Sequence, residues 1–307
     1  MKIAVIGAGH MGRYHAEKFA GLRGVKLAAV VDADGARAAA LAEKLGAKPL
    51  TDYRELFGVA DAAVIAVPTD RHHAVARDCL QHGLHLLIEK PIATTLAEAD
   101  ELIALAEEKR LVLQVGHVER YNKAFRALVA RMGRPVFIEA ERLAAFKQRG
   151  AEVDVVLDLM IHDLDLACAL ARAEPSGVSA TGFRVLTNAI DIANARIEFA
   201  NGCVANLAAS RVSQAAVRKL RVFQPGLYVS ADLQGGKLRY VRQSKGVIEQ
   251  IDESHPAGDA LADQAAAFVS AVRKKSPAEI DGRQGRRALE LALTVGQLVR
   301  ERLEKFV

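Results

Sequence analysis

The hexapeptide GAGHMG at residues 7–12 constrains the fold more than any other feature of the chain. The apolar run KIAVI precedes it at 2–6, and an amphipathic segment follows it. In a strand–turn–helix unit of this kind, Gly7 permits the tight turn, Gly9 lets the backbone approach a pyrophosphate, and Gly12 lets the helix pack against the strand. The pyrophosphate would face the free N–H groups at the helix N-terminus. The segment therefore predicts a dinucleotide-binding fold.

An acidic residue completes this pattern. The apolar run KLAAVV at 26–31 leads to Asp32, which follows Gly12 by 20 residues. An acid at this spacing can hold both hydroxyls of a ribose, and it repels a 2′-phosphate. We therefore expect NAD rather than NADP as the cofactor. His10 and Met11, which lie inside the turn, join the glycines and Asp32 as cofactor-binding candidates.

Apolar segments alternate with helical ones up to about residue 115. Apolar runs without polar interruption predict strands of a parallel sheet whose two faces are covered by helices. Ligands of such sheets bind beyond the carboxyl ends of the strands. Predicted strands cover 47–50, 61–67, 85–89 and 111–115, and predicted helices cover 34–45, 71–82 and 95–109. The candidates at this edge are Pro68, Thr69, His72, Glu89, Lys90 and His117.

Lys90 stands out among these candidates because of its position. It follows a buried strand directly and precedes a proline, which places it at the ligand edge. The ammonium of a lysine there can hydrogen-bond a substrate oxygen, and desolvation can lower the pKa of such a lysine. A surface lysine in a loop is the competing interpretation.

After about residue 120 the pattern changes. Short alternating runs with turn signals such as Asn201-Gly202 and Gly235-Gly236 predict antiparallel strands joined by hairpins. Predicted helices cover 121–132, 154–171, 259–274 and about 283–305; predicted strands cover 135–146, 178–187, 191–200, 202–213, 217–223, 226–232, 236–242 and 246–251. The expected fold is α/β, with a Rossmann dinucleotide-binding domain over 1–119. An α+β domain with a mostly antiparallel, open-faced sheet is expected over 120–307.

The predicted helix 154–171 carries an unusual polar stripe. Its segment 155–170 has no Lys, Arg or Glu, the residues that a solvated helix face usually carries. Asp158, His162 and Asp165 recur at i, i+4 and i+7, a spacing that puts them on one face of a helix. Imidazole is a suitable general base near neutral pH, because its ordinary pKa is about 6.5. From this stretch alone, a hydrogen-bonded core or surface histidine is the more common interpretation.

Composition narrows the kinds of ligand and the cellular compartment that we expect. Cys79, Cys168 and Cys203 lie far apart and form no C-x-x-C pair, which argues against a zinc site or a disulfide framework and suits a reducing compartment. We expect no signal peptide, no membrane span and no metal, and therefore a cytoplasmic protein. The formal net charge is +5, but basic residues are scattered among acids. An anionic small ligand suits this charge, and nucleic acid is not needed to explain it.

Five motifs along the chain point to one family. They are GAGHMG at 7–12, PTDRHH at 68–73, EKP at 89–91, VGHVERYN at 115–122 and D-x-x-x-H at 158–162. Together they resemble the glucose–fructose oxidoreductase, inositol dehydrogenase and rhizopine-catabolism (Gfo/Idh/MocA) family over essentially the whole chain. The resemblance implies an NAD-dependent oxidoreductase in which Lys90, Asp158 and His162 meet at the nicotinamide. His162 would then accept the proton of a sugar hydroxyl, Lys90 would stabilise charge on the oxygen, and Asp158 would orient the imidazole or the sugar.

A narrower resemblance is carried by VVLDLMIHDLD at 155–165 and RKLRVFQP at 218–225. These segments are similar to those of bacterial UDP-N-acetylglucosamine 3-dehydrogenases, a group within this family. The resemblance implies oxidation of the C3 hydroxyl to a 3-keto sugar, which an aminotransferase uses to make lipid A-type amino sugars. It also implies a homodimer or homotetramer, which an open-faced sheet would favour. Lys123 departs from the proline that many relatives have, which bears on the shape of the loop and not on the chemistry.

Other polar residues are candidate substrate contacts. His117, Arg120 and Asn122 follow the last predicted strand of the first domain and can meet sugar hydroxyls. Arg120 can equally pair with Glu119 or Glu141. Guanidinium groups suit a diphosphate because they bind phosphate through two hydrogen bonds. The basic candidates for this contact are Arg149, Arg211, Arg218, Lys219 and Arg221. Each of them can instead be a solvated or salt-bridged surface residue. Two other functions stay open: the same chemistry on a free sugar, an inositol or another cyclic polyol, and a non-catalytic NAD-sensing regulator.

Overall fold

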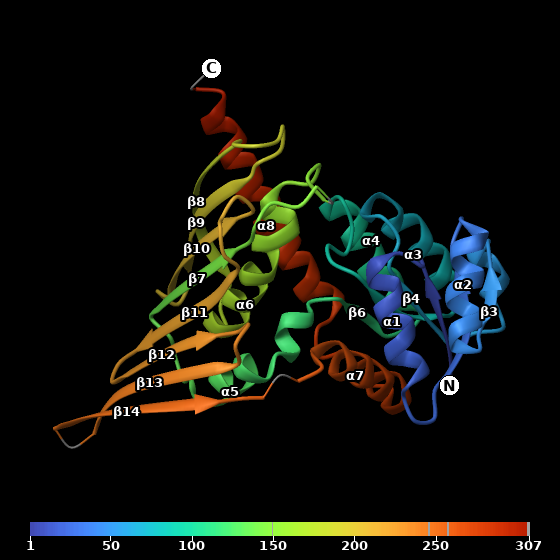
Figure 1. Cartoon of the computed structure of the whole chain (residues 1–307), viewed down its shortest axis with the longest axis horizontal. Coiled ribbons are helices and arrows are strands. Elements are labelled where there is room, and N and C mark those ends of the chain that lie inside the picture. Colours follow the sequence, from blue (N-terminus) through green and yellow to red (C-terminus); the bar gives the residue numbers. More distant parts are fainter. Residues whose placement is uncertain (149, 245, 257, 306–307) are drawn as a thin grey trace. The chain divides into compact units, whose positions relative to one another are not determined.

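The chain forms two compact units (Figure 1). The computed structural model describes residues 1–148, 150–244, 246–256 and 258–305. The N-terminal unit joins Met1–Val118 to Asp259–Arg287, and the C-terminal unit joins Glu119–Gly258 to Ala288–Val307. The expected division after residue 119 is therefore wrong for residues 259–287, which belong to the first unit.

Parallel strands form one sheet in the N-terminal unit, in the order β3-β2-β1-β4-β5-β6. The strands are β1 (Lys2–Ile6), β2 (Lys26–Val31), β3 (Lys48–Leu50), β4 (Ala62–Ile65), β5 (His85–Ile88) and β6 (Leu113–Val115). The helices are α1 (His10–Ala20), α2 (Gly35–Leu45), α3 (His72–Gln81), α4 (Leu96–Glu108), α7 (Ala260–Lys274) and the first turns of α8 (Gly282–Leu303). Short 3-10 turns lie at Tyr53–Leu56, Thr69–Arg71 and Val118–Tyr121. The last of these turns lies at the boundary between the units. This arrangement confirms the predicted α/β fold with a Rossmann-type sheet.

The apolar runs explain why this sheet is central. Every residue of the AAVI run in β4 is fully buried, as expected for a strand covered on both faces. The helices begin where side chains can cap them. The Asp34 carboxylate accepts the first free N–H groups of α2, and Thr95 and Glu98 form a capping box at the start of α4.

Helix α7 belongs to the N-terminal unit because of what its apolar face packs against. Phe268 of α7 is fully buried in the same core cluster as Phe19 of α1. The two rings meet edge-on, with 6.3 Å between their centroids. The start of α8 packs closely against β6, since a Cβ on Gly285 would lie 2.6 Å from Cγ2 of Val115. An amphipathic pattern predicts that a helix face is buried, but not in which core.

The C-terminal unit is built on one large sheet with the order β14-β13-β12-β11-β7-β10-β9-β8. The strands are β7 (Phe137–Leu143), β8 (Pro175–Phe183), β9 (Ile192–Phe199), β10 (Val204–Ser210), β11 (Val217–Gln224), β12 (Leu227–Asp232), β13 (Lys237–Ser244) and β14 (Val247–Ser254). The helices are α5 (Lys123–Arg131), a π-helical turn at Val156–Met160 that continues into α6 (Ile161–Ala171), and the rest of α8. Neighbouring strands are antiparallel except for β7 and β10, which confirms the predicted mostly antiparallel sheet.

One face of this sheet is covered and the other is open. The apolar side chains of the covered face share a core with α5, α6 and α8, which lie along that face (Figure 1). Strand β9 shows the alternation: Ala193, Ala195 and Ile197 are buried, whereas Asn194 and Arg196 between them are exposed. Such period-two alternation is the signature of a sheet that is solvated on one side.

Candidate functional site

The glycine turn lies at the carboxyl edge of the parallel sheet. Gly7 follows β1 with a φ of +99°, and its N–H donates to the Val31 carbonyl at 2.7 Å. A Cβ on Gly7 would lie 2.5 Å from the Ala66 oxygen, so a side chain does not fit there. A Cβ on Gly12 would overlap the Gly7 carbonyl oxygen, because α1 crosses the turn at close range. Both glycines therefore have the steric reason that the sequence motif predicts.

Gly9 differs from its two neighbours in the motif. A Cβ on Gly9 would meet nothing within 4 Å, so the space in front of this residue is open. Gly9 is also the N-cap of α1, whose first turn has no side-chain cap and no acidic residue. The N-terminal N–H groups of α1 are thus available for an anion such as a pyrophosphate. His10 is exposed and Met11 is partly exposed at the same end of the helix.

Asp32 connects the turn to the second strand. Its Oδ2 accepts the Ala8 N–H at 2.7 Å, and its Oδ1 accepts the Asp34 N–H at 2.9 Å. The side chain is 12% exposed, and Nη1 of Arg37 lies 3.6 Å from Oδ2. A carboxylate oxygen has more than one lone pair, so these bonds leave capacity for ribose hydroxyls. The turn residues and Asp32 together fit the adenosine diphosphate half of a dinucleotide.

The Glu89-Lys90-Pro91 segment follows β5 at the same edge, joined to Gly7 through the register Ile6↔Ile65↔Ile88. Glu89 is 7% exposed, and its Oε1 lies 2.6 Å from Nε2 of the fully buried His15. Its Oε2 accepts the Lys90 N–H at 3.3 Å, while the Lys90 side chain is partly exposed. The Lys90–Pro91 peptide is cis. Glu89 therefore supports this edge from inside, and the Lys90 side chain is left partly exposed.

His72 holds the other end of this segment. Its Nδ1 lies 2.8 Å from the Pro91 carbonyl and its Nε2 lies 3.0 Å from the Val67 carbonyl. The ring is 1% exposed, and this burial lowers the pKa of His72. With both nitrogens facing backbone carbonyls, the His72 ring is engaged within the unit, where it connects the Pro91 and Val67 segments. Pro68 and Thr69 lie nearby with exposed and partly exposed side chains, whereas His117 is 1% exposed.

The polar stripe of the C-terminal unit begins in the π-helical turn. Asp158 lies inside this turn, and His162 follows in the first turn of α6. Both side chains are partly exposed, whereas Asp165 is 3% exposed, with its Oδ2 3.9 Å from Nε of Arg120. Of the three residues expected on one face, Asp158 and His162 are therefore accessible, whereas Asp165 is buried and ion-paired. π-Helical turns are rare and are frequent at functional sites.

A buried charge network fixes the helix next to His162. Nε and Nη2 of Arg142 on β7 donate to the two carboxylate oxygens of Asp163, each at 2.9 Å. Nη1 of Arg142 donates to Glu119 at 2.9 Å, and Glu119 also accepts from Arg218 at 3.1 Å. Burial raises the pKa of Asp163 and the charge of Arg142 opposes this rise. The network stabilises the orientation of α6 relative to β7, and no sequence motif indicated it.

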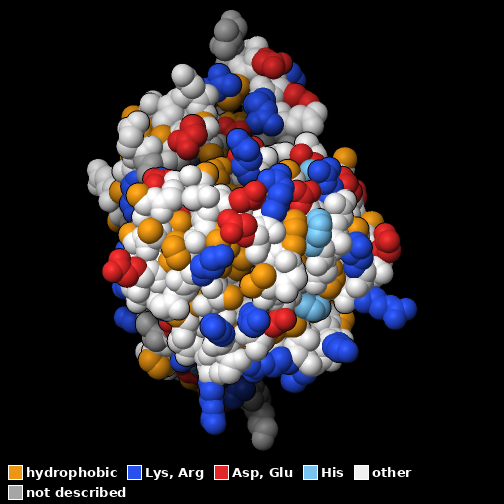
Figure 2. Space-filling model, turned by 90° about the vertical axis from the view of Figure 1, so that its right-hand side faces the viewer, with side chains coloured by type: hydrophobic (Ala, Val, Ile, Leu, Met, Phe, Trp, Pro, Cys, Tyr) orange, Lys and Arg blue, Asp and Glu red, His pale blue; other side chains and the backbone are white. Residues whose placement is uncertain are grey.

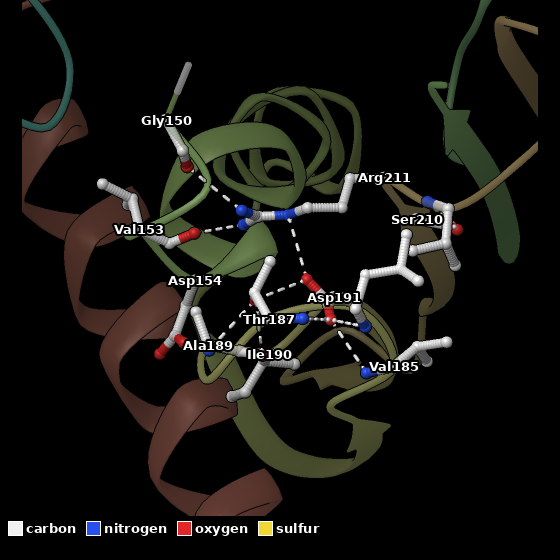
Figure 3. Close-up of polar contacts among 12 residues, drawn as sticks. Gly150, Val153, Asp154, Val185, Thr187, Ala189, Ile190, Asp191, Ser210 and Arg211 are labelled. Carbon is white, nitrogen blue, oxygen red and sulfur yellow. Dashed lines mark hydrogen bonds and ion pairs between the residues drawn. The ribbon is translucent and has the colours of Figure 1, made fainter. Parts of the chain in front are cut away.

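A second polar cluster anchors the start of the stripe helix (Figure 3). Arg211 is 6% exposed and donates to the carbonyls of Gly150 and Val153, while its Nε lies 3.7 Å from Asp191. Asp154 accepts the Ile190 N–H at 2.9 Å, which connects this cluster to the beginning of the π-helical turn. Arg211 is therefore part of the framework and is not accessible to a diphosphate.

The other predicted substrate contacts have mixed outcomes. Asn122 caps α5 through its side-chain oxygen and donates to the Leu233 carbonyl at 2.8 Å, so its amide is used within the unit. Arg221 pairs with Glu139 and Glu141, and Lys219 is exposed. Arg149 lies outside the described residues. Sequence patterns do not show which polar side chains find partners elsewhere in their own unit, and this is why Asn122 and Arg211 were expected to face a ligand.

The described residues also bear on two other features, a metal site and a membrane-spanning helix. Among these residues, no group of three or more His, Cys, Asp or Glu side chains could hold a metal ion. No helix described here is long and apolar enough to cross a membrane. Figure 2 shows one face of the molecule, on which basic and acidic side chains are interspersed over the upper part and basic ones are more frequent over the lower part.

These features define a class of protein. A glycine turn at the carboxyl edge of a parallel sheet, an acid after the second strand and a second unit with an open sheet are typical of dinucleotide-dependent oxidoreductases. Residues 1–117 match the oxidoreductase family with an NAD-binding Rossmann fold, and residues 124–224 match the Gfo/Idh/MocA C-terminal domain. The chain belongs to the Gfo/Idh/MocA family of oxidoreductases, which confirms the predicted family, enzyme class and NAD cofactor.

Individual relatives cover most or all of the chain. UDP-N-acetylglucosamine 3-dehydrogenase from Acidithiobacillus ferrooxidans is 41% identical over 99% of both chains. A solved structure of that enzyme superposes with a TM-score of 0.93 over 98% of both chains. The scyllo-inositol 2-dehydrogenase (NAD(+)) of Bacillus subtilis is 30% identical over 69% of this chain and 68% of its own length. A scyllo-inositol dehydrogenase from Lactobacillus casei, solved with NAD(H) and scyllo-inositol, shares the fold with a TM-score of 0.85 over 98% of this chain and 97% of its own, at 19% identity.

Proposed function

We propose that this protein oxidises the C3 hydroxyl of UDP-N-acetylglucosamine with NAD. The observation that carries the proposal is the 41% identity to a UDP-N-acetylglucosamine 3-dehydrogenase, which extends over 99% of both chains. The chain also has the side chains that the reaction needs. Lys90 is partly exposed at the ligand edge of the N-terminal unit, and Asp158 and His162 are partly exposed on the stripe helix of the C-terminal unit.

The proposed roles follow from the chemistry of each group. When bound, NAD supplies the hydride acceptor. His162 accepts the hydroxyl proton at a ring nitrogen, which requires a neutral imidazole before the reaction. Lys90 donates a hydrogen bond from its ammonium to the same oxygen and so stabilises the negative charge that develops there. Asp158 orients the imidazole or an adjacent sugar hydroxyl.

The decisive experiment mixes the protein with NAD and UDP-N-acetylglucosamine. We expect NADH absorbance to rise and mass spectrometry to show the loss of two hydrogens from the nucleotide sugar. A ketone trap is included, because the 3-keto product can be unfavourable at equilibrium. The His162→Ala variant should retain NAD affinity and lose about 10²- to 10⁴-fold in kcat. The control is His73→Ala, since His73 pairs with Glu101 on the surface.

A second candidate substrate is an inositol or another free cyclic polyol. The 30% identity to the scyllo-inositol 2-dehydrogenase favours it. Parallel assays with free N-acetylglucosamine, myo-inositol and scyllo-inositol separate the two candidates. Turnover of a free polyol without turnover of the nucleotide sugar would replace the proposed substrate. NAD binding without turnover of any of these alcohols would instead favour a non-catalytic, NAD-sensing regulator.

We also propose a homodimer or homotetramer that pairs the open faces of the C-terminal sheets. A row of partly exposed apolar side chains crosses that face in register: Val204, Phe137, Phe223, Tyr228 and Val241. The rings of Phe137, Phe223 and Tyr228 lie 5.6 Å and 4.9 Å apart along the row. Light scattering should show a multiple of the 33.0 kDa chain that Phe223→Glu dissociates and Val59→Glu, an exposed control in the other unit, does not. A monomeric wild type would refute this assembly.

The proposed product also suggests where the enzyme acts in metabolism. A 3-keto sugar is consumed by a reaction at its carbonyl, and amine transfer would give the 3-amino sugar of lipid A-type molecules. We propose a cytoplasmic location, for which the three free, buried cysteines are supporting observations.

A further inference from the structure

A buried carboxylate stands directly before the partly exposed Lys90. The carboxylate of Glu89 lies inside the N-terminal unit, and Gly116 packs so closely that its Cβ would be 3.1 Å from Cδ of Glu89. An ionised carboxylate in such a place requires compensation by hydrogen bonds and by opposite charge. His15 on α1 gives one hydrogen bond, since its Nε2 lies 2.6 Å from Oε1 of Glu89.

The His15 ring is committed to Glu89. It is fully buried on α1, and its Nδ1 has no hydrogen-bond partner among the described residues. The contact of Nε2 with Glu89 is therefore the polar contact through which this ring acts on the rest of the unit.

The neighbouring groups show what stabilises the carboxylate. The groups that face Glu89 are His15 from α1, His72 from α3 and Lys90 from its own segment. Burial lowers the pKa of His72, and its ring nitrogens already face the Pro91 and Val67 carbonyls. Burial acts to raise the pKa of Glu89, but the hydrogen bond and the charge of His15, followed by the charge of Lys90, outweigh it and lower the pKa. Lys90 is thus a cation that stabilises the carboxylate beside it, and this stabilisation is mutual.

We propose that Glu89 and His15 are positioning residues that hold the Lys90 ammonium in its protonated form at the ligand edge. The carboxylate fixes the Lys90 backbone through the hydrogen bond at 3.3 Å and stabilises the ammonium by its charge. His15 keeps the carboxylate ionised and oriented through its hydrogen bond. This inference rests on the proposed function in one respect, namely that the Lys90 ammonium assists the reaction.

The first test compares pH profiles of kcat. In Glu89→Gln the ammonium loses its compensating charge, so the alkaline limb should move to lower pH by about 1 to 2 units. His15→Leu leaves the carboxylate charged but without its donor, so it should lower kcat with the limb unmoved, whereas His15→Gln keeps a hydrogen-bond donor and should retain more of kcat. The matched control is Glu101→Gln, which removes an exposed His–Glu pair with a 2.8 Å separation. A folded Glu89→Gln enzyme with an unshifted limb would overturn the inference.

The second test does not depend on activity. Trace acetylation of the intact protein over a pH series, read by mass spectrometry on the peptide that contains Lys90, reports the unprotonated amine. Labelling of Lys90 should begin at lower pH in Glu89→Gln than in the wild type, while the exposed Lys26 should be unchanged. Identical labelling curves for Lys90 would refute the electrostatic coupling. An inactive wild type with the expected labelling shift would refute the proposed substrate and leave the coupling intact.

Discussion

Replacing Asp191 by asparagine should destabilise the C-terminal unit in a manner that depends on pH. Asp191 is fully buried and accepts the backbone N–H groups of Val185, Leu186 and Thr187 at 2.7 to 2.9 Å (Figure 3). Its other oxygen accepts the Thr187 hydroxyl at 2.7 Å. Burial acts to raise the pKa of Asp191, but these donors outweigh it and lower the pKa from 3.8 to about 2.

This pKa shift sets the size of the effect. Each pKa unit corresponds to about 1.36 kcal/mol, so the ionised carboxylate contributes about 2 kcal/mol to the free energy of unfolding at neutral pH. Because the folded pKa lies below the unfolded one, the contribution is complete above the unfolded pKa and is lost as the pH falls through the folded pKa. About half of it should remain at pH 3. Asparagine keeps the shape and loses the charge, and it also leaves the buried Arg211 without its acidic partner.

Denaturant unfolding followed by far-UV circular dichroism measures this difference. Asp191→Asn should lower the free energy of unfolding by about 2 kcal/mol or more at pH 7, and the difference from wild type should shrink below about pH 4. Asp252→Asn serves as the control, because Asp252 pairs with Arg239 in solvent and should matter little at any pH. Equal stabilities at pH 7, or a difference that is the same at pH 7 and pH 3.5, would refute the reasoning.

The glycine turn and the buried charge network give two further predictions. Gly12→Ala should destabilise the N-terminal unit by about 1 to 3 kcal/mol, because its Cβ would overlap the Gly7 oxygen, whereas Gly9→Ala should leave the melting temperature unchanged and weaken NAD binding in calorimetry. Equal melting temperatures for the two variants would contradict the assigned roles. Asp163→Ala should lower the free energy of unfolding by about 3 to 5 kcal/mol in denaturant titrations, since it leaves the buried Arg142 with one acidic partner in place of two. A loss below 1 kcal/mol would show that the network is not stabilising.

Most of the fold could be predicted from periodicity alone. Continuous apolar runs such as AAVI at 62–65 identify strands buried on both faces, and the alternation in β9 identifies a strand with one solvated face. The roles of Gly7 and Gly12 were predicted from the motif, and the close approaches of their Cβ positions explain them. The place of α7 was not predictable, because an amphipathic helix carries no information about which of two cores will bury its apolar face.

Sequence motifs indicate candidate residues where one short motif contains them, but they do not indicate partners that are distant along the chain. His15 was missed because its partner Glu89 lies 74 residues away along the chain. The position of Arg142 did carry a signal: in FIEAERL it shares the buried face with Ile138 and Ala140, and a charged residue on that face needs an ionic partner. The π-helical turn around Asp158 has no sequence pattern that distinguishes it from an α-helix.

The N-terminal and C-terminal units share one structural principle. In each unit a partly exposed candidate residue is the immediate chain neighbour of a buried acid that an ion pair or hydrogen bond holds: Lys90 follows Glu89, and His162 precedes Asp163. Because adjacent residues share a peptide bond, fixing the buried acid limits the backbone of the candidate residue without occupying its side chain. Precise placement on rigid elements lowers the cost of reaching a reactive geometry. Substitutions of Glu89 and Asp163 should therefore affect catalysis through position and charge, even though neither acid need touch the substrate.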